Sequence, residues 1–212
     1  MRRLLPLTFA AVLVLSACGG GDDESGTGNG CEDVDAPEPK PDGGRQPPRE
    51  QLDASKTYQV ALETNCGTFT IELDLDSAPK TATSFVALAE DGFFDDTTFH
   101  RIVPGFVIQG GDPTGTGRGG PGYQTVDPPK PNARYTKGVV AMAKSPADPP
   151  GAAGSQFFVV TGEDVGLPPE YAVLGRVVEG LDVVERIGQL GDPETEQPTQ
   201  PVVVQSMTVE TS

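Results

Sequence analysis

A short run near the middle of the chain contains a histidine, an arginine and a glutamine, which can donate hydrogen bonds or a positive charge to a bound molecule. Residues 98–112 place the only histidine, His100, beside Arg101 in an otherwise apolar stretch that also holds Gln109. A second run at 154–160 sets Gln156 before two phenylalanines. A guanidinium stays charged and presents a rigid fork of donors, which suits electrostatic stabilisation. Taken alone, Arg101 fits a surface salt bridge equally well.

The sequence lacks the residue patterns of a hydrolase triad, a dinucleotide site, a metal site and a nucleic-acid interface. Ser155 has no Gly-x-Ser-x-Gly frame, which argues against a hydrolase triad. Residues 115–120 satisfy Gly-x-Gly-x-x-Gly, but Pro121 and Gly122 oppose the helix that a dinucleotide site requires there. One histidine and three widely spaced cysteines offer no ligand cluster, so we expect no metal and no cofactor. A net charge of −16 without a basic stripe disfavours nucleic acid.

The two runs, with Gly138-Val139-Val140-Ala141-Met142-Ala143 between them, resemble the signature blocks of cyclophilins, the peptidyl-prolyl cis-trans isomerases. The resemblance covers about residues 57–210. It implies isomerisation of X-Pro bonds, with Arg101 in the place of the family's catalytic arginine. It also implies a set of substrate-binding residues: His100, Phe106, Gln109, Met142, Ala143, Lys144, Gln156, Phe158, Leu167 and Tyr171.

The resemblance gives these side chains different parts. Four would build the apolar slot for the proline ring: Phe106, Met142, Phe158 and Leu167. Each of the four also fits ordinary barrel core. Gln109 would orient Arg101, Gln156 would face the substrate, and the backbone at 143–144 would pair with an extended peptide. His100 fits either substrate contact or a hydrogen-bonded structural role.

Three positions depart from the family pattern. Lys144 stands where the family has asparagine, the loop at 166–169 lacks the tryptophan of eukaryotic members, and Tyr171 replaces a histidine at the pocket mouth. Main-chain pairing with a peptide survives the first change, and a tyrosine still offers its hydroxyl. The departures therefore bear on substrate preference more than on the reaction.

Period-two and helical patterns predict the elements that must position these residues. Alternation predicts a hairpin of strands at 58–63 and 69–75 with a turn at 65–67. Helical spacing predicts a helix from Pro79, capped by Ser77 and ended by Gly92, and a short helix around 181–187. Further strands are predicted at 97–103, 106–110, 138–143, 156–161, 172–178 and 202–209. This pattern indicates a mainly β fold, and the resemblance implies an eight-stranded antiparallel closed barrel capped by two α-helices.

The first 18 residues predict export. Arg2 and Arg3 precede an apolar stretch at 4–15 that is too short to span a membrane. The sequence Leu15-Ser16-Ala17-Cys18 resembles the bacterial lipobox, which implies cleavage before Cys18 and a lipid on its sulfur. An ordinary secretory signal with an incidental cysteine is the alternative. We expect an extracytoplasmic protein, lipid-anchored to the bacterial cell membrane through Cys18.

Residues 19–55 are rich in Gly, Pro, Asp and Glu and predict a disordered tether, followed by one isomerase domain at 56–212. With Cys18 lipidated, Cys31 and Cys66 remain as an even pair in an oxidising compartment. We expect a disulfide between them, with two free thiols as the alternative.

The expected protein is a monomer that acts on proline-containing polypeptide clients. One rival function is a binding module of the same fold without useful turnover, against which Arg101, Phe106, Gln109 and Phe158 argue. Another is a lipoprotein that binds a small ligand, which the aromatic content of 6% disfavours.

Overall fold

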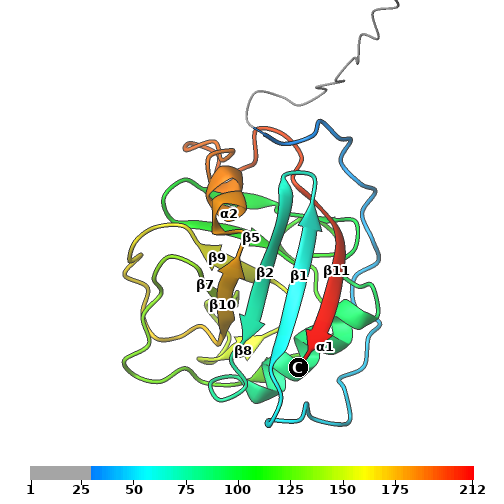
Figure 1. Ribbon diagram of the computed structural model, residues 1–212, viewed down its shortest axis with the longest axis vertical. Coiled ribbons are helices and arrows are strands. Elements are labelled where there is room, and N and C mark those ends of the chain that lie inside the picture. The colour runs from blue at the N-terminus through cyan, green and yellow to red at the C-terminus, as the bar shows by residue number, and fades with distance from the viewer. Residues whose placement is uncertain (1–29) are drawn as a thin grey trace, which may run out of the picture.

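The computed structural model describes residues 30–212 as a curled antiparallel sheet with a helix towards each end (Figure 1). The predicted signal at 1–18, its Cys18, and the part of the tether at 19–29 lie outside the described residues. The mainly β architecture with two helices was predicted from the sequence and is confirmed.

Within the described residues, nine strands form one sheet in the order β3-β11-β1-β2-β10-β7-β9-β5-β4, with every neighbouring pair antiparallel. Their bounds are β1 Tyr58–Thr64, β2 Gly67–Leu73, β3 Thr97–Thr98, β4 Arg101–Val103, β5 Val107–Gly110, β7 Val139–Met142, β9 Phe157–Val160, β10 Val173–Glu179 and β11 Val203–Thr211. A separate pair joins β6 Thr125–Val126 to β8 Ala152–Ala153. The sequence did not predict this pair, because two-residue strands carry no period.

The strand count differs from the expected eight because one expected strand is divided. Residues 97–103 were predicted as a single strand, but β3 pairs with β11 while β4 pairs with β5. Only Phe99 and His100 separate β3 from β4 in the chain, although the two strands lie at opposite ends of the strand order. The Phe99 N–H donates to the Val202 carbonyl at 2.9 Å and so continues the pairing of β3 with β11, and the chain changes partner only after Phe99. The sheet therefore curls until both of its edges lie on one continuous segment.

Helix α1 (Pro79–Glu90) begins where helical spacing predicted, but the N–H groups of its first turn find a different hydrogen-bond acceptor from the one expected. Ser77 was expected to cap it, and that prediction is wrong, because Ala78 is the N-cap and makes no side-chain cap bond. Instead, the Asp127 carboxylate accepts hydrogen bonds from the N–H and hydroxyl of Thr81, at 2.7 and 2.8 Å. A distant carboxylate thus supplies what a local serine was expected to give.

Gly92 lies just beyond the end of α1 with a φ of +63°, as a helix-ending glycine should. Helix α2 (Leu181–Gly188) follows β10, and its buried Val183, Val184 and Ile187 face the core. In Figure 1 the two helices lie towards opposite ends of the sheet.

The β4–β5–β9–β7 region of the sheet separates two apolar clusters. The interior cluster includes Ile102, Ile108, Val140, Met142, Phe157 and Val159. The outer cluster consists of Val107, Tyr135, Val139, Ala141, Phe158 and Val160, with partly buried neighbours that include Phe106, Leu167 and Tyr171. Successive residues at 107–108, 139–142 and 157–160 alternate between the two clusters, because side chains of a strand alternate between faces.

Residues 30–55 form an extended arm packed against the domain, where a disordered tether was predicted (Figure 1, blue). The Lys40 ammonium donates to the carbonyls of Gly92, Phe93 and Asp95 at 3.1, 3.0 and 2.7 Å. Leu52 packs against the interior cluster. Composition predicted a disordered tether for this segment. It missed the packing because the partners of the arm lie far away in the sequence.

A disulfide between Cys31 and Cys66 joins the start of this arm to the β1–β2 turn, which is the pairing that the sequence predicted. The adjacent Glu32 N–H donates to the Asn65 carbonyl at 2.8 Å. Both cysteines are buried. The bridge therefore fixes the arm at one end of the β1–β2 hairpin.

Candidate active site

Strand register brings three of the predicted site residues into one row. Arg101 on β4 pairs with Gln109 on β5, and Gln109 pairs with Phe158 on β9. Phe158 in turn pairs with Ala141 on β7. Directly paired residues of a sheet point to the same face, so a cation, an amide and an aromatic ring lie side by side on the outer face.

Arg101 is held by two oxygen acceptors. Its Nε donates to Glu196 Oε2 at 2.7 Å, and its Nη1 lies 3.4 Å from Gln109 Oε1. The predicted contact with Gln109 is therefore present but long. The Arg101 side chain is 34% exposed, so the rest of its fork remains open to a ligand. Sequence analysis missed Glu196, because nothing in its loop marks it as a neighbour of Arg101.

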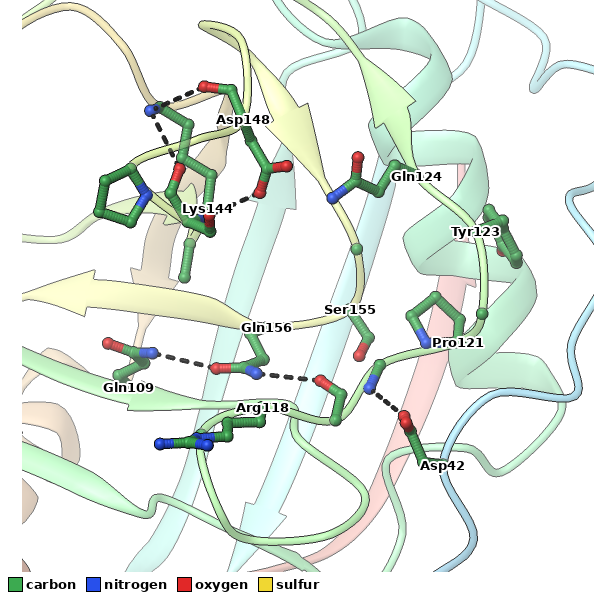
Figure 2. A pocket seen from close by; sticks show the side chains of 18 residues that line it. Asp42, Gln109, Arg118, Pro121, Tyr123, Gln124, Lys144, Asp148, Ser155 and Gln156 are labelled. Carbon is green, nitrogen blue, oxygen red and sulfur yellow. Dashed lines mark hydrogen bonds between the residues drawn. The ribbon is translucent and has the colours of Figure 1, made fainter.

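Gln109 and Gln156 form a chain of amide hydrogen bonds. Gln109 Nε2 donates to Gln156 Oε1 at 3.1 Å, and Gln156 Nε2 donates to the Gly119 carbonyl at 2.9 Å (Figure 2). These bonds fix which end of each amide is the donor. The polar side of the site is thus one connected network from Glu196 to Gly119.

The apolar side of the site is the outer cluster. Phe106, Phe158, Leu167 and Tyr171 all belong to it. Phe158 meets Tyr171 edge-on, with ring centroids 5.5 Å apart. Three of the four residues predicted for the slot therefore lie together, with Tyr171 beside them.

Met142 does not belong to the slot, and its prediction is wrong. Its side chain is 1% exposed within the interior cluster. It pairs with Phe157, the inward neighbour of Phe158, so it points away from the outer face. Val107 and Ala141 occupy the outer face instead, and the sequence analysis missed both as site neighbours.

Tyr135 fixes the loop that carries Leu167 and Tyr171. Its hydroxyl donates to the Tyr171 carbonyl at 2.7 Å and accepts from the Tyr171 N–H at 3.0 Å. Tyr135 is fully buried, and burial raises the pKa of its hydroxyl. This residue was also missed, because a single tyrosine outside both signature runs carries no pattern.

The segment at 143–144 is tied to its surroundings at the edge of the site. The Ala143 N–H donates to the Gln156 carbonyl at 2.9 Å. Lys144 Nζ lies 3.2 Å from the Glu170 carboxylate and 5.7 Å from the centre of the Tyr171 ring. The Lys144 side chain is only 5% exposed, so its charge is compensated inside the fold.

His100 lies partly buried between Arg101 and the loop that holds Gly117. Neither ring nitrogen has a hydrogen-bond partner within residues 30–212. Burial lowers the pKa of His100, and the nearby Asp112 carboxylate opposes that shift. Both nitrogens are also shielded from solvent, so the geometry decides neither for substrate contact nor for a structural role.

A hollow of about 820 Å³ adjoins the row of site residues (Figure 2). Gln109, Ala143 and Gln156 form the wall that it shares with the site. Asp42 from the arm and residues 117–124 form its other side. A bound polypeptide can therefore extend from the apolar slot across Gln156 into this space.

The arrangement offers electrostatic stabilisation beside an apolar surface. A guanidinium held by Glu196 and Gln109 is a fixed cation with free donors. Across the described residues, no group of three acidic, histidine or cysteine side chains could hold a metal ion. The residues present can stabilise an electron pair that develops on a bound nitrogen.

Known proteins resemble the chain in sequence and fold. The family model for cyclophilin type peptidyl-prolyl cis-trans isomerase/CLD matches residues 59–209. Peptidyl-prolyl cis-trans isomerase-like 1 of Neurospora crassa is 42% identical over 149 residues, which cover 68% of this chain and 90% of that protein. Peptidyl-prolyl cis-trans isomerase A of Mycobacterium tuberculosis is 39% identical over 171 residues, covering 72% and 92%. A crystal structure of a Cryptosporidium parvum cyclophilin type isomerase matches with a TM-score of 0.67 at 30% identity, covering 73% of this chain and 98% of its own.

Proposed function

The chain belongs to the family of cyclophilin-type peptidyl-prolyl cis-trans isomerases, and from this premise we propose that it assists the folding of exported proteins from a lipid anchor at the membrane. The reaction is rotation about X-Pro bonds in polypeptides. A related Cryptosporidium parvum enzyme was crystallised in the presence of the dipeptide Ala-Pro.

The chemistry needs no covalent step. Amide resonance opposes rotation with a barrier of about 20 kcal/mol, so uncatalysed exchange takes tens of seconds or more. The twisted amide returns a lone pair to the proline nitrogen, and catalysis requires tighter binding of that state than of either planar isomer. Arg101 supplies a fixed donor for the lone pair, and the outer cluster supplies an apolar surface for the ring.

The single observation that carries this mechanism is the row formed by Arg101, Gln109 and Phe158. It puts the donor and the apolar surface on one face of the sheet, within reach of one X-Pro unit. Every 1.4 kcal/mol or so that this arrangement gains in the twisted state is worth about tenfold in rate.

The export part of the proposal rests on the N-terminal sequence and the disulfide. Residues 1–18 have the charged start, apolar stretch and cysteine of a lipoprotein signal. The Cys31–Cys66 bridge is of the kind that persists in oxidising compartments. Within residues 30–212, no helix has the length and apolarity to span a membrane. A lipid on Cys18 would therefore serve as the attachment.

Two measurements test the two parts separately. A protease-coupled assay with a short Ala-Pro peptide should show isomerisation by the purified protein, and a rate equal to the uncatalysed one would reject the activity. Cys18→Ser should move the protein from the membrane fraction to the soluble fraction while its isomerase rate persists. If the variant still sediments with membranes after a salt wash, the anchor is not at Cys18.

A further inference from the structure

One residue that lines the hollow beside the active site comes from outside the part of the chain that matches the family. The family match begins at residue 59, whereas Asp42 lies in the arm and lines the hollow (Figure 2). The arm is therefore an addition of this chain to the surface on which a client would lie.

The arm is fastened by backbone bonds to the loop at 117–124, which lines the same side of the hollow. The N–H groups of Gly43 and Arg45 donate to the carbonyls of Gly120 and Pro121 at 2.9 and 3.0 Å. The Gly120 N–H donates to Asp42 Oδ1 at 2.8 Å. A Cβ on Gly122 would stand 3.1 Å from the Gly43 Cα, so the two segments approach as closely as glycine allows.

Side chains hold the arm against the end of α1. Arg45 Nε lies 2.8 Å from the Asp91 carboxylate, and its guanidinium carbon lies 5.7 Å from the centre of the Phe93 ring. Lys40 donates to the three carbonyls beyond the same helix. These contacts flank Asp42 on both sides, so its position is fixed by the fold.

The fastened loop is also the loop that orients Gln156. Gln156 donates to the Gly119 carbonyl, and the neighbouring Gly120 makes two of the three bonds to the arm. The arm thus connects through Gln156 and Gln109 to Arg101. Its influence on the reaction should be on the placement of the client.

The arm end of the hollow is acidic. Asp42 uses one carboxylate oxygen for Gly120, and its Oδ2 has no hydrogen-bond partner within residues 30–212. Lys144, a cation of the lining, is compensated by Glu170. The Arg118 side chain extends towards the Gln109 side, away from Asp42 (Figure 2).

We propose that arm residues 40–45 form part of the client-binding groove and that Asp42 receives a lysine or arginine side chain of a client beside its X-Pro bond. This inference rests on polypeptide clients of the proposed function. A partly exposed ion pair of this kind is worth about 0.2–1 kcal/mol, which corresponds to about a 1.4- to 5-fold change in affinity.

The test compares KM for three peptides: a short Ala-Pro peptide, and two longer ones that carry lysine or glutamate next to the X-Ala-Pro unit. Asp42→Asn keeps an oxygen for Gly120 and should raise KM only for the lysine peptide, by about 1.4- to 5-fold, with kcat unchanged. Asp35→Asn, an exposed acid of the same arm away from the hollow, is the matched control and should change nothing.

An unchanged KM for the lysine peptide in Asp42→Asn overturns the proposal, as does an equal rise for the lysine and glutamate peptides. The short Ala-Pro peptide tests the proposed isomerase activity by itself, because it is too short to reach Asp42. Failure of the Asp42 proposal is therefore distinguishable from failure of the proposed function.

A separate observation concerns how Arg101 is held. Glu196 is one of two non-glycine residues among 30–212 with a positive φ, at +59°. The Asp192 carbonyl accepts from the Glu196 N–H at 2.8 Å, and the Glu196 carbonyl accepts from the Ile102 N–H at 2.9 Å. This costly conformation brings the carboxylate to Arg101 Nε.

We infer that Glu196 is a positioning residue that sets the orientation of the Arg101 fork towards the client. With Nε bound by Glu196 and Nη1 near Gln109, rotation of the planar guanidinium is restricted and the remaining N–H groups face the site. Loss of that restraint should lower kcat and leave KM nearly unchanged.

Glu196→Gly is the decisive variant, because glycine adopts a positive φ without strain. It should melt at or above the wild-type temperature and lose about tenfold in kcat, the usual scale for one hydrogen bond to a charged group. Glu196→Gln keeps an acceptor oxygen and should recover most of that loss. Glu194→Gln, an exposed neighbour in the same loop, is the matched control. Wild-type kcat in Glu196→Gly would overturn the inference, because the residue would then serve the loop alone.

Discussion

The two faces of the sheet formed by β4, β5, β9 and β7 differ in what their side chains do, although the same strands supply both. On the inner face, Ile102, Ile108, Phe157 and Met142 pack into the interior cluster. On the outer face, Arg101, Gln109 and Phe158 form the row of paired site residues. Phe157 and Phe158 are both phenylalanines and are neighbours in the chain, yet they lie on opposite faces of the sheet. The direction of a side chain, set by the two-residue period, decides whether it packs into the interior or faces the candidate site.

The largest effect on the outer face should follow from Arg101→Ala. Removal of one preorganised donor typically lowers turnover about 10²- to 10³-fold. The melting temperature should stay close to wild type, because Arg101 is partly exposed and its main partner Glu196 is 46% exposed. Isomerase assays and thermal melts of the same preparation check this. A near wild-type rate would show that the row does not carry the reaction.

The inner face should respond in the opposite way to Met142→Ala. Loss of a fully buried methionine side chain should lower the free energy of unfolding by about 2–5 kcal/mol. The rate per folded molecule should stay near wild type, because the side chain points away from the slot. Urea unfolding and activity below the melting transition provide the two readouts. Lost activity in the folded variant would return Met142 to the substrate surface.

Phe106→Ala tests the apolar part of the outer face. A phenylalanine contact of about 1.5–3 kcal/mol corresponds to a loss of about 10- to 100-fold in kcat/KM. The cost in stability should be smaller than for Met142→Ala, since Phe106 is only partly buried. Kinetics on a short Ala-Pro peptide measure the first quantity. If stability falls and kcat/KM does not, Phe106 is ordinary core.

The smallest effect should come from His100 and depends on pH. Burial lowers the pKa of His100 in the folded state below the usual unfolded value of about 6.5. The unfolded chain then binds the proton more readily, so stability is complete above about pH 6.5 and declines as pH falls through the folded pKa. The change in the free energy of unfolding that this one group can cause is at most about 1.4 kcal/mol per pH unit.

Thermal melts between pH 7.5 and 5 measure that decline, and His100→Asn is the comparison. The variant should lose less stability over this range than the wild type. Parallel curves for both proteins would mean that other groups account for the pH dependence.

The signature runs located most of the outer face from sequence, but they could not assign every residue to a face. Arg101, Gln109, Phe106 and Phe158 lie where the family resemblance implied, in the row and the outer cluster. Met142 was placed on the wrong face because its short strand is buried at every position, so no polar alternation marks the direction of its side chain.

The sequence by itself determined the mainly β pattern, both helices, the Cys31–Cys66 pair and the residues that form the row on the outer face, because strand period, helical spacing and signature motifs are local properties. Only the tertiary structure decided that Asp127 caps α1, that Glu196 holds Arg101 and that the arm brings Asp42 to the hollow. Each of these contacts joins segments far apart in the chain. Curling of the sheet and closure of its loops create such neighbours, and no short window of sequence contains both partners.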